Sequence, residues 1–270
     1  MGIPQEEKVE EFLSQVARAP LSALLLDYDG TLAPFSVDRQ QAVPYAGLPA
    51  LLQRIVDTAR TRLVIVTGRD AREIGPLLDL QPSLEVWGSH GLQRLKPDGT
   101  CEMPQIPLRV AQTLEEARQW LTYQGLQDIA EFKPGSVAVH WRALEETAAT
   151  LLRGRILLGW FPIAERGSLQ LLEFDGGVEI RMADLDKGDA VRTVMEEVGD
   201  DIPVAYLGDD ATDERAFRAL GESGLTILVR PQQRRTSAQI WLKPPHELLD
   251  FLNRWWEAVK ITPLARSATY

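Results

Sequence analysis

The sequence predicts an α/β protein whose core is a doubly wound parallel sheet, with an α+β unit inserted into it. Short apolar runs ending in glycine-rich turns alternate with helical patterns in the first hundred residues. The same alternation returns near residue 203, whereas the stretch between carries helices and a hairpin signal. We therefore expect a core made of residues 1–101 and 184–270, and a cap made of residues 102–183.

Hydrophobic spacing predicts each element of the first hundred residues. Residues 5–18 have apolar side chains at the three- and four-residue spacing of an amphipathic helix. Residues 22–29, SALLLDYD, contain an apolar run too short for a helix, which is typical of a buried parallel strand. Helical spacing returns at 46–60 and at 70–78, where Asp70 is the expected N-cap. The further strands expected in this part are 62–69 and 84–91.

The remaining elements follow from the same patterns. In the cap we expect helices at 108–124 and 143–158 and a strand at 136–141. Two strands within 169–182 flank the residues DGG, which favour a hairpin turn. The core resumes with a helix that begins near Lys187. The last expected elements are a strand, turn and helix over 203–220, a strand at 225–229, a helix at 246–260 and a loose tail at 262–270.

Composition narrows the functional class. The 270 residues carry a formal net charge of −10, which disfavours a nucleic-acid partner but not a small phosphorylated substrate. One cysteine, Cys101, excludes an internal disulfide and fits a reducing compartment. The N-terminus lacks the apolar core of a signal peptide, and no stretch reaches the roughly 20 apolar residues of a membrane span. We expect a cytoplasmic monomer without membrane or nucleic-acid partners.

Acidic and other polar residues gather where the predicted strands end. In an open α/β sheet, ligand sites form beyond the carboxyl ends of the strands. A set of carboxylates at one such place is stable around a cation, and oxygen ligands without His or Cys indicate Mg²⁺. Any single aspartate could instead be a turn former or a helix cap, but the coincidence of the whole set argues against that. The residues expected there are Asp27, Asp29, Thr67, Lys187, Asp209, Asp210 and Asp213.

Four segments in the order DYDGTL, VIVTGR, DKG and GDDATDE resemble the motifs of the haloacid dehalogenase-like (HAD) phosphatase superfamily. They extend from residue 27 to residue 214, and the first and last are highly specific. The insertion between the second and third motifs resembles the larger α+β cap of one branch of that superfamily. The resemblance implies a HAD-like Rossmannoid core under a substrate-selecting cap.

The resemblance also implies catalytic roles. Asp27 would be the nucleophile that becomes an aspartyl phosphate. Asp29 would donate a proton to the leaving sugar oxygen and then accept one from water. Thr67 would hydrogen-bond the transferring phosphoryl group, and Lys187 would balance its charge.

The metal site is implied in the same way. Mg²⁺ would be bound by Asp27, Asp209 and the backbone carbonyl of Asp29. Asp210 and Asp213 would support these ligands or reach the ion through water.

The cap contains a second informative segment, EFKPGSVAVHWR at residues 131–142. Together with GSHG at 88–91 and VEIR at 178–181, it is similar to the trehalose-6-phosphate phosphatase family. The resemblance implies that Glu131, Lys133 and Glu179 bind the sugar. Two departures, Phe132 at a frequently acidic position and Trp141 at a usual tyrosine, leave those three residues unchanged.

Other polar residues near these motifs have two readings. His90, in a glycine-rich strand end, is expected at the substrate, whereas His140 in an apolar strand is expected to support the site. Arg69 either binds phosphate or anchors its loop. Glu131 and Lys133 alternate on a possible strand and could instead form a solvated face.

Taken together, these resemblances imply an Mg²⁺-dependent hydrolase that releases trehalose from trehalose 6-phosphate, and we expect the cap to close as a lid. Alternative substrates are sucrose 6-phosphate, a glycosyl-3-phosphoglycerate or a hexose phosphate. A sugar mutase shares the aspartyl chemistry. A regulatory module without catalysis is a further alternative, although the intact acids and Lys187 speak against it.

Overall fold

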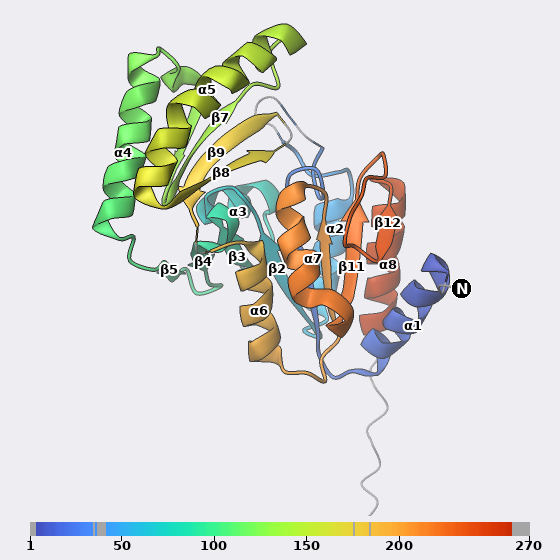
Figure 1. Ribbon diagram of the computed structural model, residues 1–270. Coiled ribbons are helices and arrows are strands. Elements are labelled where there is room, and N and C mark those ends of the chain that lie inside the picture. Colours follow the sequence, from blue (N-terminus) through green and yellow to red (C-terminus); the bar gives the residue numbers. More distant parts are fainter. Residues whose placement is uncertain (1–3, 35, 37–41, 175, 184, 261–270) are drawn as a thin grey trace, which may run out of the picture.

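The computed structural model describes residues 4–34, 36, 42–174, 176–183 and 185–260. It consists of a larger core and a smaller cap, each built around its own sheet (Figure 1). Two connections join the core and the cap, because the cap is inserted between the two halves of the core sequence.

An eight-stranded sheet forms the centre of the core. Its strands are β1 Ser22–Leu26, β2 Thr61–Val66, β3 Glu85–Gly88, β4 Gln93–Leu95, β5 Cys101–Glu102, β10 Val204–Gly208, β11 Leu225–Val229 and β12 Ile240–Leu242. The order across the sheet is β12-β11-β10-β1-β2-β3-β4-β5. The six strands from β12 to β3 are parallel, and β4 and β5 add an antiparallel edge. The first strand, β1, therefore lies near the middle, between β10 and β2.

Helices cover both faces of this sheet (Figure 1). One face packs against α1 Gln5–Arg18, α2 Leu48–Asp57, α3 Ile74–Leu78 and α8 His246–Lys260, and the other against α6 Lys187–Val198 and α7 Glu214–Leu220.

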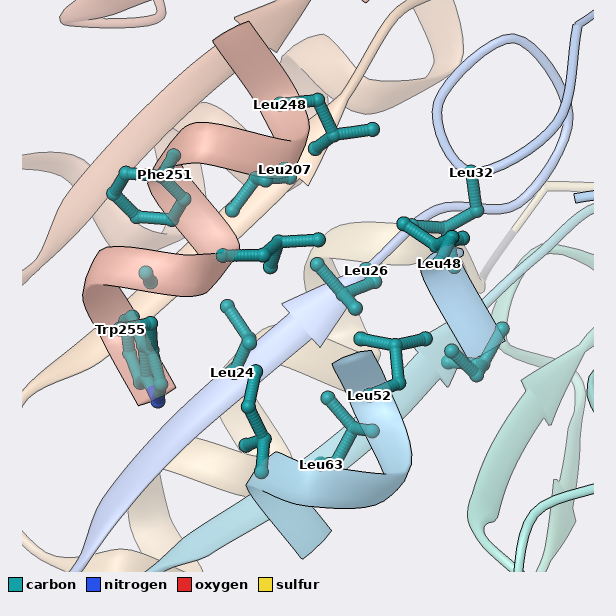
Figure 2. Close-up of a cluster of buried hydrophobic side chains, with 14 of the residues drawn as sticks. Leu24, Leu26, Leu32, Leu48, Leu52, Leu63, Leu207, Leu248, Phe251 and Trp255 are labelled. Atoms are coloured by element: carbon teal, nitrogen blue, oxygen red, sulfur yellow. The ribbon is translucent and has the colours of Figure 1, made fainter. Parts of the chain in front are cut away.

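Alternation along β1 explains why both faces are buried. Leu24 and Leu26 belong to the cluster with α1, α2 and α8, whereas Leu25 faces α6 and α7. Figure 2 shows Leu24 and Leu26 between α2 and the Phe251 and Trp255 side chains of α8. A strand buried on both faces needs a continuous apolar run, which is what residues 23–26 supply.

The cap is a four-stranded antiparallel sheet covered on one side by two helices. Its strands are β6 Ala130–Lys133, β7 Ser136–His140, β8 Leu169–Phe174 and β9 Gly177–Met182, in the order β6-β7-β9-β8. Its helices are α4 Leu108–Tyr123 and α5 Glu146–Gly167. Along β9, Val178 and Ile180 pack under the helices, so Glu179 and Arg181 point to the opposite face, toward the core.

The predicted fold class is confirmed, and most predicted elements are present. The two strands predicted within 169–182 pair as β8 and β9, with Phe174 opposite Gly177; Asp175 between them lies outside the described residues. The predicted tail at 262–270 also lies outside them. Within the described part of the chain, no helix has both the length and the apolar character that a bilayer span requires.

Three features differ from the sequence prediction. Strands β4, β5 and β12 were not predicted, since segments of two or three residues are too short to show a period. Because β5 pairs with β4, the core sheet extends one residue past the expected boundary at 101. Helix α5 continues to Gly167 instead of ending at 158, despite Gly159 and Pro162. Apolar residues beyond that point, among them Trp160, are buried in the cap core and outweigh the cost of the breakers.

Candidate active site

The carboxyl ends of three neighbouring strands lie side by side beneath the cap. Asp27 follows β1, Gly68 lies two residues beyond β2, and Asp209 follows β10. Because β1 pairs with both β2 and β10, these residues come together at one edge of the sheet. A cavity of about 620 Å³, its open mouth included, lies there. It is lined by Asp27, Asp29, Ser36, Gly68, His90, Glu131, Lys133, His140, Arg142, Phe174, Lys187, Asp209, Asp210 and Thr212.

The predicted nucleophile Asp27 is paired with Lys187. The Lys187 Nζ donates to Asp27 Oδ1 at 2.6 Å, and both side chains are almost fully buried. Thr31 Oγ1 donates to the other Asp27 oxygen at 3.2 Å. Burial raises the pKa of Asp27 to about 7 against the lowering effect of the ammonium. Burial alone would lower the pKa of Lys187, but Asp213 and Asp27 raise it well above its ordinary value, so this lysine stays charged.

Asp213 organises the floor of the cavity. One of its oxygens accepts from Lys187 Nζ at 2.8 Å and from Tyr206 Oη at 2.7 Å. The other accepts from the backbone N–H groups of Asp209 and Asp210, at 3.0 and 2.9 Å. With four donors on its two oxygens, Asp213 has little capacity left for a metal ion.

Asp209 has the opposite environment. Its side chain is 2% exposed, and neither carboxylate oxygen has a hydrogen-bond partner among the described residues, although Arg230 Nη1 lies 4.0 Å from Oδ2. Burial, together with the nearby Asp27 and Asp213 charges, raises its pKa well above the ordinary value. Ligand oxygens of Asp27, Asp209 and Asp213 lie within 4.8 Å of one another. A buried carboxylate without a donor is costly unless a cation compensates it, so this site fits the predicted Mg²⁺, with Asp27 and Asp209 as the side-chain ligands.

Asp29, the predicted acid and base, is held by Arg69. The guanidinium donates through Nε to Asp29 Oδ2 at 2.7 Å and through Nη2 to Oδ1 at 2.5 Å. Arg69 is 1% exposed, does not line the cavity, and lies 3.8 Å from Glu73. Of the two readings given to Arg69, this bidentate geometry favours anchoring over phosphate binding, because the fork is already occupied by a carboxylate.

Thr67 is also not among the residues that line the cavity. It is fully buried, and its Oγ1 accepts from the backbone N–H of Arg69 at 3.1 Å. Its carbonyl accepts from the backbone N–H of His90 at 2.9 Å. The residue that lines the cavity here is its neighbour Gly68. The predicted contact of the Thr67 hydroxyl with phosphate stays a prediction.

A charged network joins the cap to the core. Lys133 Nζ lies 2.6 Å from Glu179 Oε1 and donates to the carbonyl of Gly68 in the core at 3.0 Å. Ser136 Oγ donates to the same Glu179 oxygen at 2.8 Å. The ring of His90, from the core, places Nε2 3.2 Å from Glu179 Oε2. Glu179, predicted on the sugar, is therefore occupied by these three groups and does not line the cavity.

Protonation of this network follows from its burial. Burial lowers the pKa of His90 to about 4, so the ring is neutral and can donate its Nε2–H to Glu179. Burial would raise the pKa of Glu179, but Lys133 and His90 lower it well below the ordinary range. Glu179 thus carries a negative charge that holds Lys133 in place.

The outer part of the cavity belongs to the cap. His140 Nε2 lies 2.9 Å from Glu131 Oε2, and that oxygen is 3.9 Å from Lys133 Nζ. The ring of Phe174 lies 5.4 Å from that of His140, centroid to centroid. His140 lines the cavity, closer to the substrate space than a purely supporting residue would be.

Arg142, expected either to pair with a core carboxylate or to steady the cap, lines the cavity. Sequence reasoning missed several residues of this site: Thr31, Phe174, Tyr206, Arg230 and Arg234. Of these, Thr31 lies inside the first motif, so its place there was the available signal. Phe174 and Arg234 had none, since neither belongs to a motif and only the folded chain brings them near the acids.

Comparison with known proteins agrees with this geometry. The model of the trehalose-phosphatase family matches residues 25–245, which include all four motifs and the cap. The chain belongs to this family. A trehalose-phosphate phosphatase of Mycobacterium marinum is 32% identical over 249 residues, covering 87% of this chain and 61% of the relative. The chain thus spans about three-fifths of the length of this curated relative.

Solved structures show the same fold. The C-terminal domain of a trehalose-6-phosphate phosphatase from C. albicans superposes with a TM-score of 0.79 at 19% identity, covering 92% of this chain and 96% of that one. A phosphatase of the HAD superfamily from Bacteroides thetaiotaomicron gives a TM-score of 0.58 at 15% identity, covering 87% and 95%. The resemblance to the trehalose-6-phosphate phosphatase family and the HAD fold, predicted from the motifs, is confirmed.

Proposed function

We propose that this chain is an Mg²⁺-dependent phosphatase that hydrolyses trehalose 6-phosphate to trehalose and phosphate. The observation that carries the proposal is the pairing of Asp27 with Lys187 beside the buried carboxylate of Asp209, which accepts no hydrogen bond from the described residues. This arrangement offers a nucleophile, a fixed positive charge and a cation site at one point. Membership of the trehalose-phosphatase family supports the choice of substrate.

In the proposed reaction Asp27 attacks phosphorus, so that a bond forms between its carboxylate oxygen and phosphorus as the bond to the sugar oxygen breaks. Asp29, oriented by Arg69, gives a proton to the departing sugar oxygen. It then takes a proton from the water that hydrolyses the aspartyl phosphate. Lys187 stays charged throughout and neutralises phosphoryl oxygens. Mg²⁺, when bound by Asp27 and Asp209, supplies further positive charge for the carboxylates and the phosphoryl group.

The cap would select the sugar. Glu131 presents a carboxylate to the cavity, as recognition of sugar hydroxyl groups requires, and His140 fixes its orientation. Lys133 lines the same cavity and fastens this side of the cap to the core through the carbonyl of Gly68. The single cysteine, Cys101, is a free thiol, as is usual for proteins of reducing compartments, and we include a cytoplasmic location in the proposal.

A panel of phosphate esters tests this assignment by measuring released phosphate with and without Mg²⁺. We expect the highest kcat/KM with trehalose 6-phosphate, lower values with sucrose 6-phosphate, glycosyl-3-phosphoglycerate and hexose phosphates, and no turnover after chelation. A higher kcat/KM with another ester would show that trehalose 6-phosphate is not the substrate, but the protein would still be a phosphatase.

The variant Asp27→Asn separates an enzyme from a regulatory module. Asparagine keeps the size of the side chain but cannot form the phosphoryl ester, so we expect kcat to fall by at least about a thousandfold. An unchanged thermal midpoint shows that the fold is intact. Equal, very low turnover by both proteins would favour the regulatory alternative, and phosphate transfer to a second sugar would indicate a mutase.

A further inference from the structure

The carboxylate of Asp209 is not held by any hydrogen bond within the described residues, yet a cation ligand must be kept in a defined position. Its orientation therefore depends on the backbone of the loop that carries it. From inside, Asp213 fixes the N–H groups of Asp209 and Asp210. The carbonyl groups of these two residues need a second partner on the opposite side of the loop.

Arg234 provides that partner for both carbonyls, and Arg230 Nη1 adds one longer hydrogen bond, of 3.4 Å, to the carbonyl of Asp209. Arg234 Nε donates to the carbonyl of Asp209 at 3.2 Å and its Nη2 to the carbonyl of Asp210 at 2.8 Å. Its Nη1 donates to Glu214 Oε1 at 2.6 Å, at the start of α7. The Arg234 side chain is 24% exposed, so these contacts are partly shielded from water. One guanidinium thus bridges two consecutive carbonyls and the helix that follows them.

Only arginine can make this bridge. The guanidinium has five N–H donors in a rigid plane, whereas a lysine ammonium is a single point on a flexible stem. Glu214 keeps the fork in place, because its other oxygen accepts from the backbone N–H of Ser237 at 2.8 Å. The 230–238 loop and the 209–214 loop are therefore fastened to each other through Arg234.

We propose that Arg234 is a positioning residue that sets the affinity of the site for Mg²⁺ by fixing the backbone that carries Asp209. The inference rests on the cation site of the proposed function. It assigns no contact between Arg234 and the ion or the substrate. The positive charge of Arg234 repels a nearby cation, so removing the charge alone would strengthen Mg²⁺ binding. Removing the hydrogen bonds of the guanidinium would weaken Mg²⁺ binding, so the two effects have opposite signs.

Calorimetric titration of Mg²⁺ into the substrate-free protein tests the proposal directly. Loss of a group that orients a metal ligand weakens binding by roughly 10- to 100-fold. We expect a weakening of that size for Arg234→Met and nearly as large a one for Arg234→Lys, which keeps the charge but not the fork. Arg235→Met is the matched control, since that neighbouring side chain is exposed, and it should bind as the wild type does.

Kinetics give a second readout. The Mg²⁺ concentration for half-maximal activity should rise in parallel with the dissociation constant, while KM for the sugar phosphate at saturating Mg²⁺ stays within about twofold. Thermal unfolding without Mg²⁺ shows whether the variants are folded. Unchanged or tighter Mg²⁺ binding by Arg234→Met, or wild-type binding by Arg234→Lys, would overturn the proposal. A wild-type protein that hydrolyses the ester yet binds no Mg²⁺ would overturn the cation site itself.

Discussion

Ser89 and His90 are consecutive non-glycine residues in the left-handed region of backbone conformation, with φ of 48° and 58°. Such a conformation costs of order 1–3 kcal/mol per residue and persists where the surroundings enforce it. Here it lays the His90 ring against Gly68, where an added Cβ would lie 2.5 Å from the ring, and brings Nε2 to Glu179. The strained backbone therefore holds the His90 ring at the junction between cap and core.

The His90→Gln variant tests the neutral state of this ring. Folded His90 has a pKa of about 4 and unfolded histidine about 6.5, so the unfolded chain gains a proton first as the pH falls. The contribution of the neutral His90 ring to the free energy of unfolding is fully present above pH 6.5 and is lost as the pH falls toward 4. Relative to His90→Gln, which does not titrate, the wild type should lose roughly 2–3 kcal/mol over that range.

Urea unfolding of both proteins between pH 4 and pH 8 measures this difference. Glutamine can still donate to Glu179, so the variant should fold above pH 6.5. A difference in the free energy of unfolding that does not change with pH would show that the ring is not kept neutral.

At the scale of single elements, helix α5 illustrates how burial overrides local propensity. Gly159 lets α4 approach, since a Cβ there would lie 2.1 Å from the ring of Trp120. Trp160 next to it is fully buried under the cap sheet, whereas Leu158 on the opposite side is 80% exposed. The helix is therefore held by one face only, and the apolar residues of its outer face contribute little to folding.

Two substitutions in α5 measure this asymmetry. Trp160→Ala removes the largest fully buried side chain of the cap and should cost about 3–5 kcal/mol. Leu158→Ala, on the same helix, should change the free energy of unfolding by no more than about 0.5 kcal/mol. Denaturant unfolding followed by tryptophan fluorescence and circular dichroism gives both values. Similar losses for the two variants would contradict the assignment of the buried face.

At the scale of the whole molecule, the cavity exists only where cap and core meet. The core supplies the acids and Lys187, and the cap supplies Glu131, His140 and Phe174. The Lys133 hydrogen bond to Gly68 and the contact of His90 with Glu179 cross the boundary. In the proposed function, recognition of the sugar is thus the task of the cap and phosphoryl transfer the task of the core, with the cavity between them.

The Lys133→Met variant should separate the two tasks. Loss of a buried charge that pairs with Glu179 and reaches Gly68 should lower kcat/KM for trehalose 6-phosphate by about 100-fold. For p-nitrophenyl phosphate, which has no sugar for the cap to recognise, we expect a change within about threefold. Lys96→Met, at a half-exposed surface pair, is the control. Equal losses on both esters would place Lys133 in the phosphoryl chemistry instead.

Much of the site was predictable because the motif residues follow the carboxyl ends of strands that the topology makes neighbours. Asp27 and Asp209 lie at the ends of adjacent parallel strands, so their convergence follows from the strand order. Arg69 and Glu179 show the limit of this reasoning. Their residue types indicate phosphate and sugar contacts, but the folded chain offers Arg69 a closer partner in Asp29, and Glu179 one in Lys133.

The sequence by itself determined the α/β fold class and the four motifs, since periodicity and turn residues are local properties. Only the tertiary structure decided which buried carboxylates are hydrogen-bonded: among the described residues, Asp213 has four donors and the Asp209 carboxylate has none. It also brought Arg234 to the loop of Asp209. The free energy of a buried charge depends on every group that packs around it, and those groups come from segments far apart in the chain.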